Sequence, residues 1–251
     1  GTAVALAIIK TQGDKILDVP LAQVGGKGLF VKEIEAALLD GRVDLAVHSM
    51  KDMPAEVPEG LAIGAVPERE TATDVLVSRG ALPLREIAPG GVIGTSSLRR
   101  AAQIRHLRPD LTVVPLRGNV ETRLAKLDGG ELAGIVLAAA GLKRLGLAER
   151  ASEHLPPDVM LPAVGQGALC VEVRREDPVI GPIVAALDHR ESRLAVSAER
   201  AFLRRLQGGC QVPIAGHARI EGPRLALTGL VAGVDGTPLV ADRRSGPAET
   251  A

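Results

Sequence analysis

The chain has 251 residues, with 30 Lys and Arg against 30 Asp and Glu, 1% aromatic residues and two cysteines. Zero net charge and two phenylalanines argue against a nucleic-acid partner, because such proteins need positive charge to displace counterions and aromatic rings to stack on bases. The cysteine count excludes a disulfide scaffold and a four-cysteine zinc site. No apolar run approaches the ~20 residues that span a bilayer, so no membrane partner is expected. The length allows two or three domains.

Short runs of Val, Ile and Leu alternate with helical patterns as far as about residue 173. The run at 4–9 predicts a buried strand, and Phe30, Ile34 and Leu38 recur at helical spacing before Gly41, a residue typical of helix ends. This alternation predicts an α/β fold with parallel sheets and helices on both faces. The other predicted elements are helices at 96–107 and 119–127 and strands at 44–47, 61–66, 74–78, 92–94, 111–116, 134–138 and 168–173.

The pattern changes after Pro178. An amphipathic helix is predicted at 190–206, followed by three strands at 214–220, 225–231 and 238–243. A helix followed by an antiparallel run is typical of a separate, small α+β domain. A three-stranded sheet of this kind leaves one face that needs cover.

Three strand-to-helix junctions carry cationic or hydroxyl side chains, at 48–54, 94–100 and 116–123. The carboxyl ends of strands in open α/β sheets are where ligands bind. Helix N-termini attract anions, and arginines add bidentate donors for carboxylates or phosphates. The sequence therefore indicates an anion site where the junctions meet. A solvated surface loop, an ordinary helix cap and solvated arginines are the alternatives.

The two cysteines have different surroundings. Cys170 lies in an apolar strand and is predicted to be buried and structural. Cys210 lies in a Gly-rich turn, which makes it a candidate nucleophile or attachment point, with an unreactive exposed thiol as the alternative. The glycines of 161–168 suit a hinge between lobes. The five histidines show no metal-ligand spacing, so no metal site is expected.

These segments occur in an order that resembles the porphobilinogen deaminase (hydroxymethylbilane synthase) family. The resemblance runs from about residue 8 to the end of the chain. It is carried by long, mostly uninterrupted segments at 10–14, 24–30, 46–52, 94–100, 116–119, 139–146, 161–168 and 208–213.

The resemblance implies three α/β domains, two of which are lobes of the periplasmic-binding-protein type with the ligand cleft between them. The first lobe would comprise 1–67 plus 168–185 and the second 73–163. The third domain, 189–251, is a small α+β domain that carries the cofactor cysteine.

The resemblance also implies a reaction. Four porphobilinogen molecules are joined head to tail with release of ammonia, on a dipyrromethane cofactor in thioether linkage to Cys210, and water then releases hydroxymethylbilane. Each pyrrole bears an acetate and a propionate, which explains the need for arginines. These arginines are expected to lie away from competing carboxylates. Asp52 would stabilise positive charge near the pyrrole nitrogen, and a part in proton transfer stays open.

By the same resemblance, substrate or the growing chain would be bound by Arg117, Arg123 and Arg144, and the loop with Lys27 and Phe30 would cover the cleft. The residues expected to bind the cofactor are Cys210, Ser49, Lys51, Asp52, Thr95, Ser96, Ser97, Arg99, Arg100 and Arg123.

The sequence departs from the family pattern at both ends and at Gln23, where many members have Lys. The family's opening segment, which supplies an arginine and a serine to the site, and its closing helix are expected to be missing. A monomer in the cytoplasm is expected. The alternatives are a non-catalytic two-lobed binding protein for a small carboxylate and a protein that binds nucleic acid or a phosphate ligand, which rests only on the arginines and helix N-termini.

Overall fold

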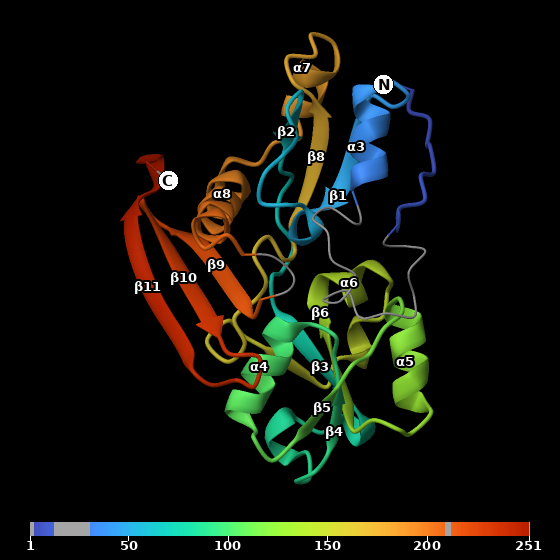
Figure 1. Cartoon of the computed structure of the whole chain (residues 1–251), viewed down its shortest axis with the longest axis vertical. Coiled ribbons are helices and arrows are strands. Elements are labelled where there is room, and N and C mark those ends of the chain that lie inside the picture. Colours follow the sequence, from blue (N-terminus) through green and yellow to red (C-terminus); the bar gives the residue numbers. More distant parts are fainter. Residues whose placement is uncertain (1–2, 13–30, 209–211, 251) are drawn as a thin grey trace.

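The computed structural model describes residues 3–12, 31–208 and 212–250. Within them the strands form three sheets, at the top, the bottom and the left of the view in Figure 1. The first sheet has the order β1-β8-β2, from Leu45–Ser49, Leu169–Arg174 and Leu61–Ala65. Helix α3 (Lys32–Leu39) packs on one face of this sheet and α7 (Ile180–Ala185) on the other.

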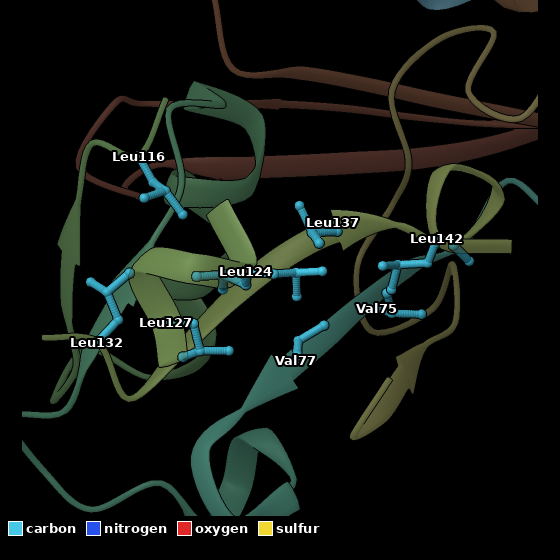
Figure 2. Close-up of a cluster of buried hydrophobic side chains, with 10 residues drawn as sticks. Val75, Val77, Leu116, Leu124, Leu127, Leu132, Leu137 and Leu142 are labelled. Atoms are coloured by element: carbon cyan, nitrogen blue, oxygen red, sulfur yellow. The ribbon is translucent and has the colours of Figure 1, made fainter. Parts of the chain in front are cut away.

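The second sheet has the order β5-β4-β6-β3-β7. Val75 and Val77 of β3 face α5 and α6 in the cluster that Figure 2 shows, whereas Leu76 faces α4 on the other side. Helices thus cover both faces. The bounds are Asp74–Ser78 for β3, Val92–Gly94 for β4, Thr112–Val114 for β5, Gly134–Ala138 for β6, Glu153–Leu155 for β7, Leu98–Leu107 for α4, Val120–Asp128 for α5 and Ala139–Arg144 for α6.

The third sheet is antiparallel, with β9 (Ile214–Glu221), β10 (Arg224–Ala232) and β11 (Leu239–Pro247) in sequence order. Helix α8 (Arg190–Arg205) packs against this sheet (Figure 1). The Phe202 ring lies against Gly216 and Gly229, which are paired across β9 and β10. A Cβ at Gly229 would stand 2.6 Å from the ring, so the bare backbone makes room for one of the two aromatic side chains.

Two expectations about the strands are wrong. The first sheet is antiparallel throughout, and in the second only β5, β4 and β6 run parallel. The chain crosses from the first sheet to the second just before β3, and from the second back to the first just before β8. These two strands therefore run antiparallel to their neighbours. The segment 4–9 forms no strand, and Leu6 is 95% exposed.

Most other elements lie within two residues of their predicted ends, and the α/β class is confirmed. Predicted strand 111–116 shortens to 112–114, and β11 runs on to residue 247. Ser97 and Asn119 cap α4 and α5 as expected from their hydroxyl and amide groups. The sequence did not predict β7, α6 or α7. No helix in the part of the chain that the structure describes is long and apolar enough to cross a membrane.

Candidate functional site

The first junction follows β1 directly. Ser49 pairs with Leu169 at the end of the strand, and the Met50 amide donates to the Ala168 carbonyl over 3.0 Å. The chain then turns through a short 3-10 helix, Met50–Asp52, and leaves it at Met53, whose amide donates to the Met50 carbonyl. This turn leaves Lys51 partly buried and Asp52 exposed.

The second junction joins β4 to α4, and its three hydroxyl residues bind the loop itself. Thr95 Oγ1 accepts from the Ser97 amide, and Ser96 Oγ donates to the Leu116 carbonyl over 2.9 Å. Ser97 Oγ accepts from the Arg100 amide and so caps the helix. These bonds fix the first turn of α4, and with it the two arginines that follow.

Those two arginines meet a buried carboxylate, Asp74, at the start of β3. Arg99 Nη1 lies 2.7 Å from Asp74 Oδ2, and Arg100 donates to Oδ1 from Nη2 at 2.7 Å and from Nε at 3.1 Å. Burial acts to raise the pKa of the Asp74 carboxyl, but Arg100 and Arg99 together hold it well below its ordinary range. The expectation that no carboxylate competes for the site arginines is therefore wrong for Arg99 and Arg100.

One carboxylate between two guanidinium groups leaves a positive charge, and other cations lie nearby. Burial lowers the pKa of the Lys51 ammonium; Asp52 raises it, and Arg100 lowers it further. Lys51 comes from the first sheet and Arg100 from a helix of the second, so the two junctions converge. Arg99 Nε is buried and has no hydrogen-bond partner among the described residues.

The third junction, between β5 and α5, adds two more arginines. Arg123 Nε donates to the Gly118 carbonyl over 2.8 Å, and Gly118 has the left-handed φ of 114° that this tight turn requires. Burial lowers the pKa of the Arg123 guanidinium, and the neighbouring Arg100 and Arg117 lower it further. We call the set Lys51, Arg99, Arg100, Arg117 and Arg123 the cationic cluster.

Other predicted site residues lie apart from the cluster or outside the described residues. Arg144 is exposed at the last position of α6 and makes no hydrogen bond to the described part of the chain. Lys27, Phe30 and Cys210 lie outside the described residues. Cys170 is fully buried, as predicted, and burial raises the pKa of its thiol to about 12. No group of three metal-ligating side chains is arranged to hold a metal within 3–12, 31–208 and 212–250.

Two buried polar residues that support the cluster were missed in the sequence. Asp74 begins an ordinary apolar strand, so nothing in the pattern sets it apart. Gln166 lies in the predicted hinge, where its Nε2 donates to Asp74 Oδ1 over 2.8 Å. The glycines on either side indicated a close backbone approach, and a Cβ at Gly167 would stand 2.5 Å from the Thr71 carbonyl oxygen.

The sequence was compared with known proteins. Residues 1–181 match the family model "Porphobilinogen deaminase, dipyromethane cofactor binding domain", and residues 193–250 match "Porphobilinogen deaminase, C-terminal domain". The chain belongs to the porphobilinogen deaminase family. It is 57% identical to the porphobilinogen deaminase of Pelobacter propionicus over 98% of this chain and 79% of that protein, and 57% identical to that of Geobacter metallireducens over 98% and 77%.

Solved structures show a more distant likeness to this porphobilinogen deaminase family member. A periplasmic binding protein of Salmonella typhimurium with high arginine specificity is 16% identical, with a TM-score of 0.39 over 70% of this chain and 77% of that one. A TRAP periplasmic solute binding protein of Desulfovibrio salexigens is 11% identical, with a TM-score of 0.41 over 73% and 63%. The family assignment therefore rests on the sequence matches.

Proposed function

We propose that the chain is a tetrapyrrole-forming transferase that condenses four porphobilinogen molecules into hydroxymethylbilane and releases ammonia at each addition. The observation that carries this proposal is the convergence of the three junctions: the cationic cluster gathers beside Asp52, in a chain whose family is porphobilinogen deaminase. A polycarboxylate substrate needs such a cluster, because each bound carboxylate requires a cationic hydrogen-bond donor.

The residues present fit the dipyrromethane cofactor of the family. Its pyrrole rings carry carboxylates. The cluster offers a buried Arg99 Nε that has no partner in the described part of the chain, and two cations, Lys51 and Arg123, whose pKa values burial lowers. A carboxylate bound in the cluster would give Arg99 Nε a hydrogen-bond partner. It would also stabilise the charged forms of Lys51 and Arg123 against the cost of burial. The match of residues 1–181 to the cofactor-binding domain agrees with this fit.

The roles of the residues follow the three junctions. When bound, dipyrromethane supplies the anchored end from which the product is built, and Cys210 would hold it through a thioether. Arg117, Arg123 and the exposed Arg144 would bind the carboxylates of incoming substrate, and Lys27 and Phe30 would lie in the cover of the cleft. The side chains proposed to bind the cofactor carboxylates are Ser49, Lys51, Thr95, Ser96, Ser97, Arg99, Arg100 and Arg123.

Asp52 is the proposed catalytic residue. It is the exposed carboxylate at the first junction, whereas Asp74 is committed to Arg99 and Arg100. Loss of ammonia from porphobilinogen leaves positive charge on the pyrrole, and a single carboxylate directed at the ring nitrogen stabilises that charge.

The domain organisation is proposed on the three sheets. The first lobe would comprise 1–67 plus 168–185, the second 73–163 and the cofactor-carrying domain 189–251, each built around one sheet. A monomer in the cytoplasm is proposed as well. Light scattering of the purified protein and fractionation of cells test these two statements.

The proposed function is tested by the mass of the purified protein and by ammonia release from porphobilinogen. The intact mass should exceed the sequence mass by two linked pyrroles, and Cys210→Ser should remove the excess. Asp52→Asn should keep the cofactor but slow ammonia release by about 100-fold or more, because it removes the charge that stabilises the reacting pyrrole. Wild-type protein without added mass and without ammonia release would instead support the binding-protein alternative.

A further inference from the structure

We propose that Asp74 is a positioning residue for the cofactor site: its carboxylate holds the guanidinium groups of Arg99 and Arg100 in one arrangement, which Gln166 ties to the segment that crosses back to the first sheet. This inference rests on the proposed function, because it takes Arg99 and Arg100 to bind the cofactor carboxylates.

Asp74 is fully buried, and both of its oxygens are in use. Oδ2 accepts from Arg99 Nη1 at 2.7 Å, and Oδ1 accepts from Arg100 Nη2, Arg100 Nε and Gln166 Nε2 at 2.7, 3.1 and 2.8 Å. The contacts to Arg100 use two nitrogens of one guanidinium, which fixes the orientation of its plane. The arrangement leaves neither arginine free to rotate.

The charges explain why a carboxylate is needed at this point. Arg99 and Arg100 are adjacent in sequence and only 5% and 6% exposed, so their guanidinium groups repel each other in a region that water does not screen. Asp74 between them offsets that repulsion, and the three side chains together keep one positive charge. That remaining charge, with the Arg99 Nε that no described residue contacts by a hydrogen bond, is what the group offers to an anionic ligand.

Gln166 lies in the segment that crosses from the second sheet back to the first, and its side chain connects that segment to Asp74. Its Nε2 donates to the Ala72 carbonyl at 2.6 Å as well as to Asp74, and its own backbone carbonyl accepts from Arg69 Nε at 2.9 Å. The crossing segment is held at its other end too, because the Leu161 carbonyl accepts from Arg99 Nη1 at 2.8 Å. Both segments that join the first and second sheets therefore contact the Asp74 group.

The first crossing runs through Ala72 into β3, and the second runs from Leu161 through Gln166 into β8. A change in the angle between the two sheets would move these segments and so strain the contacts of Asp74. The position of Arg99 and Arg100 thus depends on Asp74 directly. It depends on Gln166 through Asp74 and through Gln166 Oε1, which accepts from Arg99 Nη2 at 3.5 Å.

The test replaces Asp74 by Asn, which keeps the shape but removes the charge and turns one acceptor oxygen into an amide nitrogen that faces an arginine donor. In fresh Asp74→Asn protein, the fraction of folded molecules with the cofactor mass should fall, and reconstitution of the cofactor-free protein should slow by roughly 10- to 100-fold, the range for a lost hydrogen bond to a charged group. Gln166→Met leaves the contacts of both arginines with Asp74 in place, removes only the long contact of Arg99 Nη2 with Gln166 Oε1, and should slow reconstitution less.

Asp188→Asn is the matched control. Asp188 also forms an ion pair, with Arg193 Nε at 2.7 Å, and accepts from the Val66 amide, but it lies at the junction of the first sheet with α8. This variant should lose stability yet load cofactor at the wild-type rate. In the Arg99→Lys background, Asp74→Asn should slow loading by less than it does alone, because both changes act on the same contact.

Wild-type loading in both Asp74→Asn and Gln166→Met, or equal slowing in Asp188→Asn, would overturn the inference. If Asp74→Asn does not fold, Gln166→Met decides alone. A wild-type protein that lacks the added mass contradicts the proposed function instead, so the two failures are told apart.

Discussion

Two fully buried carboxylates stand at the junctions of the sheets, and they are paired in different ways. Asp74 binds two guanidinium groups and the Gln166 amide. Glu199 binds one guanidinium, that of Arg69 at 2.6 Å, and accepts from the backbone amides of Gly165 and Ala218 at 2.7 and 2.8 Å. The first group keeps a positive charge, and the second is neutral.

The charge balance of each group sets what it can do. Burial raises the pKa of the Glu199 carboxyl against the opposing effect of Arg69, whereas two arginines lower that of Asp74. A neutral group with every oxygen satisfied joins three parts of the chain: the first crossing at Arg69, the second crossing at Gly165 and the third sheet at Ala218. A group with spare charge can hold these parts and also receive an anion. Buried ion pairs of the same appearance therefore serve different purposes.

The largest expected effect comes from breaking the neutral group. Glu199→Gln leaves Arg69 nearly buried without its counterion, so the free energy of unfolding should fall by about 3–5 kcal/mol in urea titration. Cofactor content per folded molecule should stay at the wild-type level. Glu191→Gln, at an exposed position of the same helix, is the control and should change stability by no more than about 0.5 kcal/mol. A selective loss of cofactor in Glu199→Gln would erase the distinction between the two groups.

A smaller effect is expected from altering the charged group without removing its charge. Arg100→Lys keeps the cation but loses the two-nitrogen contact with Asp74, at a cost of about 1–3 kcal/mol. Cofactor loading, followed by intact mass, should fall by roughly 10-fold. Arg244→Lys, in an exposed pair with Asp242, should load normally. Full loading of Arg100→Lys would show that a point charge is sufficient.

The smallest effect concerns pH and the neutral group. Burial lowers the pKa of the His217 imidazole to about 4, and Arg69 and Arg219 act in the same direction. As the pH falls below about 6.5, the His217 imidazole takes up a proton in the unfolded chain, whereas in the folded chain it does so only near pH 4. The contribution of His217 to the free energy of unfolding is therefore highest above pH 6.5 and decreases as the pH falls from there.

The loss between pH 7 and 5 should be on the order of 1 kcal/mol, since His217 is partly exposed. His217→Gln should flatten the pH dependence of urea unfolding by that amount. His154→Gln, at an exposed position of β7, is the matched control. An unchanged slope in His217→Gln would place the acid sensitivity elsewhere.

Local features were predicted well because short-range chemistry decides them. Ser97 and Asn119 cap their helices through bonds to amides three residues ahead, and Gly41 follows α3 with a φ of 70°. A convergence of the junctions was also predicted from their place at strand ends, but at one sheet edge, whereas Lys51 and Arg100 follow strands of different sheets. Motif order indicated the family, which the comparisons confirm.

Long-range features were not predicted, because nothing local specifies them. The direction of β8 depends on where the chain crosses, and Asp74 differs from any polar residue at the start of a strand until Arg99 and Arg100 fold against it. Gln166 was not predicted, because it lies in a glycine-rich segment whose pattern indicated only a close approach of the backbone. The apolar run at 4–9 shows that strand propensity alone does not make a strand.

The central place of β8 in the first sheet has a consequence for the order in which the protein can fold during synthesis. β1 and β2 do not pair with each other but only with β8, and 124 positions separate His48 from its buried partner Glu172. The second sheet is complete once β7 has been made, but the first lacks its middle until Arg174 has left the ribosome. The earliest-made of the described strands thus wait for their partner until much of the chain has been made, and their edges stay open to wrong pairing until then.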